Sequence, residues 1–188
     1  MKPAIKKLIT SIALFAIVLS TNAQKNFTLD ATKSTFSVSG TSTMHDWTMK
    51  SALGTGTANL TVANSKLEKI TSLSISLASE SIKSEKTSMD KVAYKTLKTD
   101  KFKTIKYVLK SATKVNETTW NLVGTYTIAG VSKEVKTAVK ATVANGVVSL
   151  DGSNKITFTQ FGMKSPTAML GTIKTGEDLT VKFSLKLK

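Results

Sequence analysis

Few residues of this chain have the side-chain types that catalysis or metal binding needs. The 188 residues include no cysteine and a single histidine, His45. The lack of cysteine excludes a thiolate nucleophile, a disulfide framework and a cysteine-ligated metal site. One histidine cannot supply the two or three imidazoles of a typical zinc site within one subunit. These absences argue against an enzyme, and we predict no catalytic residue, no metal and no cofactor.

The remaining candidates for acid–base chemistry are His45 beside Asp46, and the two carboxylates Asp90 and Asp100. A histidine next to an aspartate could act as a general base that the carboxylate orients. Consecutive residues of a strand point to opposite faces, so we do not expect His45 and Asp46 to pair. Asp90 and Asp100 lie in a lysine-rich segment, where we expect solvated ion pairs. The role of His45 stays open.

The N-terminal segment is typical of an export signal. Three lysines precede a nearly apolar run over residues 8–19, and the small residues Thr21 and Ala23 follow it. This arrangement predicts a signal peptide over residues 1–23, cleaved near Ala23, and a mature domain over residues 24–188 that is periplasmic or secreted. The alternative is an uncleaved membrane anchor, which the shortness of the apolar run disfavours.

The mature chain alternates apolar and polar residues along most of its length. This period of two is typical of strands with one buried and one solvated face, and the abundant Thr and Val suit strands. Turn signals separate the runs, and Asn145-Gly146 predicts a tight hairpin. The clearest alternating runs are residues 35–40, 72–77, 105–109, 120–128, 135–143 and 179–188.

One segment breaks this period. From Met89 to Leu97 the apolar residues recur near helical spacing, so we predict a short helical insertion over residues 84–98, capped by Ser or Thr hydroxyls. About eight antiparallel strands in one domain must protect their edges, and closing into a barrel is the usual solution. The lysine-rich C-terminus argues against a transmembrane barrel. The predicted fold is all-β: an extended antiparallel β-barrel of about eight strands with a short helical insertion.

Several segments resemble the YceI-like family in their order and spacing. The most specific is Gly124–Val135, a strand that runs into Ile-x-Gly-Val-x-Lys-x-Val, and Leu97–Phe102 and Phe161-Gly162 support it. The resemblance covers about Phe27 to Lys188. It implies a lipocalin-like extended barrel whose elongated apolar interior holds a polyisoprenoid or another long-chain amphiphile.

Two further segments, Ser42–Trp47 and Gly162–Thr175, resemble a secreted, lysine-rich branch of that family found in Bacteroidetes-type bacteria. The function predicted is thus that of an exported soluble protein that binds a long-chain isoprenoid or fatty lipid for transport or storage. The loops over residues 83–102 and 162–175 are predicted to form the entrance to the interior.

The predicted ligand contacts come from the inward faces of the strands and from these two loops. An apolar chain needs only an apolar lining and a shape, and methionine suits a lining that adapts to a flexible chain. Each inward residue has the alternative role of plain barrel core. The predicted ligand-binding residues are Trp47, Leu73, Ile75, Leu77, Leu97, Phe102, Leu122, Tyr126, Val139, Phe158, Phe161, Met163, Met169 and Phe183.

Lysine dominates the charge of the chain. There are 27 lysines, no arginine and 12 acidic residues, a net charge of +15. Nucleic acid is disfavoured as a partner, because there is no arginine for base recognition and there are few aromatic residues for stacking. The lysines are spread along the strands, which favours solubility and edge protection. An alternative function is a non-enzymatic module that binds acidic envelope polymers or anionic membrane surfaces; whether the protein forms a homodimer is left open.

Overall fold

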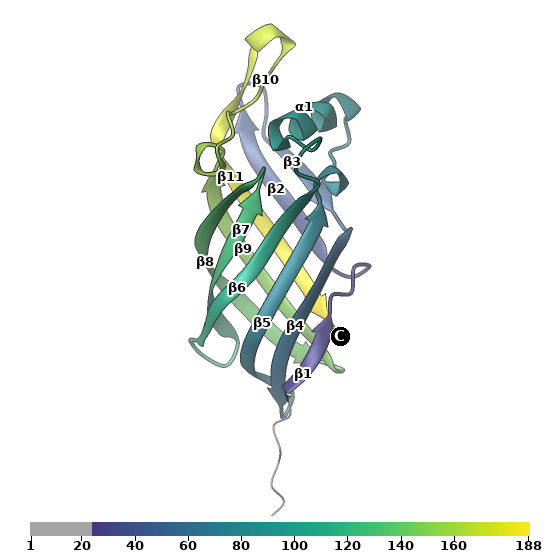
Figure 1. Ribbon diagram of the computed structural model, residues 1–188, viewed down its shortest axis with the longest axis vertical. Helices are drawn as coiled ribbons and strands as arrows, with labels where there is room; N and C mark the ends of the chain where they lie inside the picture. Colours follow the sequence, from purple (N-terminus) through teal and green to yellow (C-terminus); the bar gives the residue numbers. More distant parts are fainter. Residues whose placement is uncertain (1–23) are drawn as a thin grey trace, which may run out of the picture.

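An antiparallel sheet curls into an elongated barrel in the computed structural model, which describes residues 24–188 (Figure 1). The predicted signal peptide, residues 1–23, lies outside the described residues. The strands are β1 (Gln24–Thr28), β2 (Thr35–Ser42), β3 (Trp47–Ser51), β4 (Gly54–Ala63), β5 (Lys66–Ala78), β6 (Thr104–Lys114), β7 (Thr119–Ile128), β8 (Val131–Ala144), β9 (Val147–Thr157), β10 (Thr167–Ala168) and β11 (Ile173–Leu187). The helices are α1 (Thr87–Leu97) and the short 3₁₀ turns η1 (Ser79–Ser81), η2 (Thr159–Phe161) and η3 (Met169–Gly171).

The predicted fold class is confirmed. Eight of the strands have eight or more residues, while β1, β3 and β10 are short additions. The alternation in the sequence corresponds to inward and outward side chains: in β5, Leu73, Ile75 and Leu77 are buried and the residues between them are not. The curled sheet is therefore stabilised by the apolar face that it turns inward.

The strand order is β1-β4-β5-β6-β7-β8-β9-β11-β2-β3, with β10 paired to β11. Short contacts hold the sheet in its curled shape. Thr28 and Lys188 exchange backbone hydrogen bonds of 2.8 and 2.9 Å, and Leu29 bridges Leu187 beside them. Near the other end of the barrel, Lys50 of β3 bridges the chain that follows β5.

Asp30 strengthens the contact at the C-terminus. Its carboxylate accepts hydrogen bonds from Lys188 Nζ at 2.8 Å and from the hydroxyl and amide of Thr32. The Lys188 ammonium, followed by Thr32, lowers the pKa of Asp30 to about 2, because both partners stabilise the charged form. The ion pair therefore persists far into acidic solution.

The two ends of the barrel carry different connections (Figure 1). One end, which we call the base, carries the tight turns between β4 and β5, β6 and β7, and β8 and β9. The predicted hairpin at Asn145-Gly146 is confirmed, and both residues have the positive φ that Asn and Gly adopt readily. The opposite end, which we call the mouth, carries the β2–β3 loop, α1, the β7–β8 turn and the segment from η2 to η3.

The helix α1 is the predicted insertion, and it ends one residue before Lys98, which adopts the left-handed conformation common after helices. The predicted Ser or Thr cap is wrong, because Lys86 precedes the helix and makes no side-chain cap. Instead, the amide and hydroxyl of Ser84 donate hydrogen bonds of 2.7 and 2.8 Å to the Asp90 carboxylate.

Asp90 thus ties the first turn of α1 to the loop before it. The solvated ion pairs expected for Asp90 and Asp100 are not found among residues 24–188. In the same part of the chain, no helix is both long enough and apolar enough to cross a bilayer.

The interior divides into two packed clusters. The larger cluster fills the half of the barrel towards the base and includes the fully buried Leu60, Leu150 and Leu187. The smaller cluster, around Phe161 and Leu179, lies towards the mouth. The half of the interior at the mouth is less completely filled, and the candidate site lies there.

Candidate ligand-binding cavity

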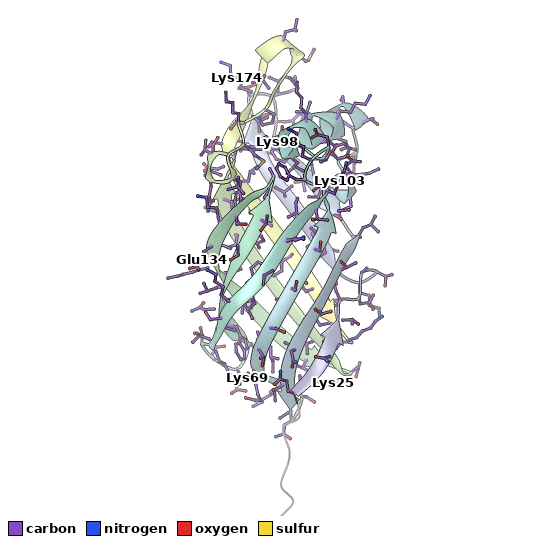
Figure 2. The ribbon with its side chains drawn as sticks, viewed as in Figure 1. Lys25, Lys69, Lys98, Lys103, Glu134 and Lys174 are labelled. Carbon is purple, nitrogen blue, oxygen red and sulfur yellow. The ribbon has the colours of Figure 1, made fainter. Side chains whose placement is uncertain are left out.

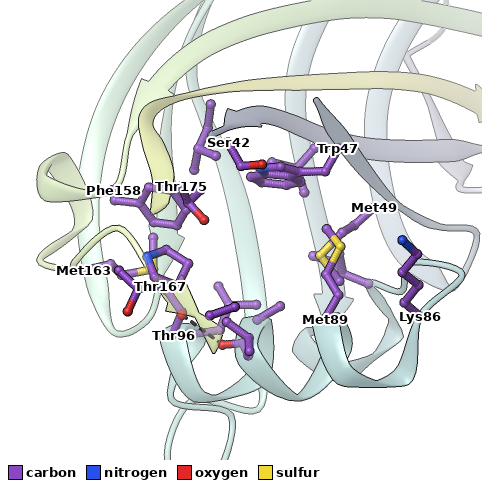
Figure 3. A pocket seen from close by; sticks show the side chains of 18 of the residues that line it. Ser42, Trp47, Met49, Lys86, Met89, Thr96, Phe158, Met163, Thr167 and Thr175 are labelled. Carbon is purple, nitrogen blue, oxygen red and sulfur yellow. Dashed lines mark hydrogen bonds between the residues drawn. The ribbon is translucent and has the colours of Figure 1, made fainter. Parts of the chain in front are cut away.

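A cavity of about 610 Å³ occupies the mouth end of the barrel (Figure 3). Its walls come from β2, β3, β9 and β11, and α1 covers it from one side. Its volume falls within the roughly 300–1,000 Å³ typical of small-molecule sites. Because most of the side chains that line it are apolar, the cavity suits a ligand with a largely apolar surface.

The side of α1 that faces the cavity is apolar, yet none of the helix residues is fully buried. Met89, Val92, Ala93 and Leu97 line the cavity at spacings of three, one and four residues, which place them on one helix face. A helix packed against a filled core buries such a stripe. Here the stripe faces the cavity, so part of its apolar surface stays accessible to solvent.

Polar contacts attach α1 and the residues after it to η1. The Tyr94 hydroxyl donates to the Glu80 carbonyl oxygen at 2.9 Å, and the Thr99 hydroxyl donates to the Glu80 carboxylate at 2.7 Å. The Ser79 hydroxyl donates to the carbonyl oxygen of Phe102 at 2.8 Å. Hydrogen bonds thus hold α1 at both ends, since Ser84 holds its first turn through Asp90, while its apolar face is only partly buried.

Methionine is concentrated in this cavity. Each of the five methionines between residues 24 and 188 contributes to the lining. Met49 and Met163 are buried, at 3% and 5% exposure, whereas Met44 and Met169 are largely exposed at the opening. Figure 3 shows Met49 from β3 and Met89 from α1 projecting into the same space. Unbranched thioether side chains adapt to irregular shapes, so this lining can accommodate different apolar chains.

Trp47 forms a fixed part of the wall. It begins β3 and pairs with Gly40 of β2, where a Cβ would come within 2.5 Å of the indole ring. Only glycine leaves room for the ring in this position. The indole N–H donates to the carbonyl oxygen of Thr41 at 3.1 Å, which sets the orientation of the ring over the cavity (Figure 3).

His45 and Asp46 lie in the β2–β3 loop and not in a strand, contrary to expectation. The imidazole Nδ1 lies 2.8 Å from the Asp46 carbonyl oxygen, and the Ser42 hydroxyl donates to the His45 carbonyl oxygen at 2.7 Å. Within residues 24–188, no carboxylate hydrogen-bonds to the ring. His45 is exposed, lines the cavity near its opening and helps to order this loop.

A few polar side chains interrupt the apolar lining. Ser42, Thr167 and Thr175 contribute hydroxyls, and Lys86 contributes an ammonium beside α1 (Figure 3). Such groups can bind the polar end of an amphiphile, whereas the strand residues Val38, Ile156 and Val181 offer apolar surface. The cavity therefore has a polar and an apolar part.

A second cavity, of about 60 Å³, lies towards the base. Phe36, Ile105 and Val181 line both cavities, so they form the partition between them. The rings of Tyr107 and Tyr126, with centroids 5.1 Å apart, border the smaller one. Burial raises the pKa of Tyr107 to about 12 and also raises the pKa of Tyr126, so both phenols stay neutral.

Glu177 of β11 anchors the loop that forms one side of the opening. Its carboxylate accepts hydrogen bonds of 2.6 Å from the Ser165 hydroxyl and from both the hydroxyl and the amide of Thr159. The hydrogen bond from Ser165, followed by those from Thr159, holds the pKa of Glu177 below its usual value. The start of the loop is fixed in this way, while its tip projects beyond the barrel (Figure 1).

The structure brings five of the predicted ligand-binding residues together around the large cavity. They come from β3, α1 and the segment after β9, which are far apart in the sequence. These residues are Trp47, Leu97, Phe158, Met163 and Met169.

The other predicted ligand-binding residues lie elsewhere in the interior. Phe102 packs against Gly130 in the β7–β8 turn, and Val139 and Phe161 are buried in the packed clusters. Leu77 is buried in β5 outside both linings. Those that border the small cavity are Leu73, Ile75, Leu122, Tyr126 and Phe183.

Sequence reasoning missed several residues of the lining. Phe36 and Val38 belong to an alternating run, which indicates the inward face of a strand but not the height in the barrel. Met89 and Val92 belong to the predicted helix, and their spacing already marked its apolar side. The helical spacing was therefore the feature of the sequence that could have indicated a helix covering the cavity.

We compared the sequence with models of known protein families. A model of the YceI-like domain matches residues 27–187. The chain belongs to the YceI-like domain family. The match spans all of the long strands and confirms the resemblance carried by residues 97–102 and 124–135. The Bacteroidetes-type branch remains a prediction. A search among curated proteins found no match.

Solved structures share the fold of this YceI-like domain. BcnA from Burkholderia cenocepacia aligns with a TM-score of 0.71 at 16% identity, over 84% of this chain and 98% of that protein. A polyisoprenoid binding domain from Saccharophagus degradans, implicated in plant cell wall breakdown, aligns with a TM-score of 0.66 at 12% identity, over 86% and 97%. The YceI protein of Campylobacter jejuni aligns with a TM-score of 0.58 at 19% identity, over 70% and 79%.

Proposed function

We propose that this YceI-like domain binds a polyisoprenoid or another long-chain amphiphilic lipid in the mouth cavity, and that it transports or stores this lipid after export. The observation that carries the proposal is the apolar cavity of about 610 Å³, covered by a helix whose apolar face is only partly buried by protein. A domain of the same fold from Saccharophagus degradans is a polyisoprenoid binding domain, which supports this class of ligand. The signal-like residues 1–23 support export to the periplasm or the medium.

The hydrophobic effect supplies the binding energy. At about 25 cal/mol per Å² of apolar area removed from water, a chain that buries roughly 300 Å² gains about 7 kcal/mol before ordering costs. The same event covers the apolar side of α1, including Val92 and Leu97, which the protein alone leaves partly accessible. Binding therefore completes the burial of the helix.

The lining also orients the ligand. The polar head lies at the opening, where Lys86, Ser42 and Thr175 offer an ammonium and hydroxyls. The apolar tail points into the barrel, towards the partition formed by Phe36, Ile105 and Val181. No ionisable group at the tail end is needed, so we propose a binding role without a catalytic step.

Protein purified under native conditions from its own host tests this proposal. Native mass spectrometry and organic extraction should find a long-chain lipid at one molecule per chain. The alternative function, a module that binds acidic envelope polymers through its lysines, requires no such lipid. Protein that contains no lipid, and that takes up no fluorescent prenyl probe after delipidation, would remove the proposal.

A pair of matched variants places the ligand. Val92→Asp puts a carboxylate on the cavity side of α1, while Val115→Asp makes the same change at an exposed position by the β6–β7 turn. Burying a charge against an apolar chain is unfavourable, so Val92→Asp should weaken probe binding on the order of tenfold or more. Val115→Asp should bind as the wild type does. Equal binding by folded Val92→Asp protein would place the ligand elsewhere.

A further inference from the structure

The hairpin formed by β10 and the start of β11 ends in an exposed apolar tip. Met169 and Leu170 are 70% and 108% exposed, and both have positive φ, at 48° and 53°. Turn positions with positive φ usually carry Gly or Asn, as Asn145 and Gly146 do at the base. Here two large apolar residues occupy a backbone conformation that does not favour them.

The fold itself gains little from this tip. Leu170 lines neither cavity, and Met169 reaches the cavity only at its edge, where it is largely exposed. Exposed apolar side chains held in an unfavourable backbone conformation are expected where they meet something outside the chain. The tip therefore has the features of a contact surface.

A third exposed apolar side chain lies on the neighbouring loop. Met44, in the β2–β3 loop, is 62% exposed. Backbone and side-chain hydrogen bonds join this loop to the hairpin: the Thr43 amide donates to the Lys174 carbonyl oxygen at 3.0 Å, and the Lys174 amide donates to the Thr43 hydroxyl at 3.2 Å. Met44 and Met169 both line the cavity opening, and Leu170 follows Met169 at the hairpin tip; we call these three residues the apolar rim.

The lysines at the mouth differ from those elsewhere. Among residues 24–188, every ion pair uses Lys66, Lys110, Lys114 or Lys188, on the barrel wall or towards the base. Residues 83–103, around α1, carry seven lysines against three acidic residues, and none of these lysines forms an ion pair in that part of the chain.

Two more such lysines flank the tip itself. Lys164 and Lys174 are exposed and form no ion pair among the described residues. Figure 2 shows Lys174, Lys98 and Lys103 on the half of the molecule that carries the mouth. Their ammonium groups are therefore available to anionic groups outside the protein.

We propose that the apolar rim docks this protein, mouth first, on an anionic lipid bilayer. The side chains of Leu170, Met169 and Met44 enter the boundary between headgroups and acyl chains, and the surrounding lysines bind anionic headgroups. A bilayer fits better than a protein groove, because the apolar side chains project from two separate loop tips and a fluid surface accepts them without a matching shape.

Docking in this orientation places the cavity opening against the bilayer. A lipid can then pass between bilayer and cavity without its chain crossing water. This exchange step rests on the proposed function, whereas docking on the bilayer does not, and the two can be tested separately.

Vesicle co-sedimentation tests the docking. Wild-type protein should bind vesicles of phosphatidylglycerol and phosphatidylcholine, and Met169→Asn/Leu170→Asn should bind on the order of tenfold more weakly. Asparagine tolerates positive φ, so this variant removes the apolar groups without adding strain. The matched control is Val115→Asn, which removes an exposed apolar side chain by the base and should bind as the wild type does.

A second pair of variants tests the charges. Lys164→Gln/Lys174→Gln should weaken binding on the order of tenfold at low salt, with the difference shrinking as salt screens the charges. Lys25→Gln/Lys69→Gln, which neutralises two exposed lysines at the opposite end, should have little effect (Figure 2). Equal vesicle binding by wild type and Met169→Asn/Leu170→Asn, or binding to neutral vesicles as strong as to anionic ones, overturns the proposal.

Lipid uptake separates docking from the proposed function. Leu170→Asn, at a residue that lines neither cavity, should take up a fluorescent prenyl probe slowly from anionic vesicles but take up a short, water-soluble prenyl probe as the wild type does. If the wild-type protein binds vesicles but takes up neither probe, docking is supported and the proposed function is contradicted. A dimer that forms in solution and is abolished by Leu170→Asn, without vesicle binding, overturns the docking proposal in favour of a second copy of the chain.

Discussion

The base and the mouth of this barrel are built from the same strands, but side chains fill the interior more completely at the base than at the mouth. Towards the base, Leu60, Leu150 and Leu187 are fully buried, and the cavity there has a volume of about 60 Å³. At the mouth the cavity reaches about 610 Å³, and the apolar side of α1 is not fully buried. One sheet thus has a packed half and a half with room for a ligand.

The two ends also differ in the residues of their turns. In the β8–β9 turn at the base, Asn145 and Gly146 have positive φ, while at the tip of the β10–β11 hairpin Met169 and Leu170 have it. The residues of the base turn suit the folded chain alone, and those of the hairpin tip do not. The comparison indicates that the base supplies most of the stability of the fold. The mouth can therefore contain side chains that bind other molecules instead of stabilising the fold.

The largest expected effect compares leucines from the two halves. Leu185→Ala removes a side chain that is 3% exposed in the core of the base, and it should lower the free energy of unfolding by about 2–5 kcal/mol. Leu97→Ala, at the cavity, should cost less than about 1.5 kcal/mol, because its side chain is only partly buried. Urea denaturation of both variants measures the difference. Equal losses of unfolding free energy would contradict the difference in packing between the two halves.

A smaller effect is expected at the wall of the mouth cavity. Gly40→Ala forces a methyl group against the indole of Trp47 and should lower the free energy of unfolding by roughly 1–3 kcal/mol. It should also shift the fluorescence of Trp47, measured in a Trp120→Phe background. Ser39→Ala, at the adjacent residue on the opposite strand face, is the control and should leave the emission unchanged.

Exchanging residue types between the turns sharpens the comparison. Asn145→Leu at the base should lower the free energy of unfolding by about 1–2 kcal/mol, because a leucine fits a positive φ poorly. Leu170→Asn at the mouth should raise it by roughly 0.5 kcal/mol for the converse reason. Thermal unfolding checks both. A loss of stability in Leu170→Asn would mean that the leucine serves the fold.

The smallest expected effect is local and depends on pH. The pKa of Glu177 is lower in the folded protein, so its contacts with Ser165 and Thr159 stabilise the loop above the ordinary glutamate pKa. This contribution is lost as the pH falls through the lowered pKa. Amide NMR shifts of Ser165 and Thr159 should follow that titration and should lose it in Glu177→Gln. Unchanged wild-type shifts over this range would show that Glu177 does not anchor the mouth.

Much of the fold could be predicted because its signals are local. An inward side chain at every second residue is a property of the strand itself, and the runs through Leu73 and Leu122 show it plainly. The hairpin at Asn145-Gly146 and the helix over Thr87–Leu97 likewise depend on neighbouring residues. The hydrogen bonds between Ser84 and Asp90 of α1 were not predictable in this way, because they join a helix turn to a loop of irregular shape.

The candidate site was harder to predict. Val139 and Val181 occupy the same kind of inward strand position, yet Val139 is core and Val181 lines the cavity. Their heights in the barrel depend on the register between strands and on the offset of each strand from its partners. The alternating pattern carries no information on that height, so residues of the core and of the cavity were predicted together.

By itself, the sequence determined that this chain forms a barrel with an apolar interior, a helical insertion and a lysine-rich exterior, since these properties follow from periodicity and composition. Only the tertiary structure decided where that interior stays open. The five methionines after residue 23 are spread from Met44 to Met169, and they meet in one cavity because strand pairing brings the β2–β3 loop, α1 and the β10 hairpin to the same end. The cavity depends on contacts between residues more than 100 positions apart, such as Thr43 with Lys174, and no local pattern specifies them.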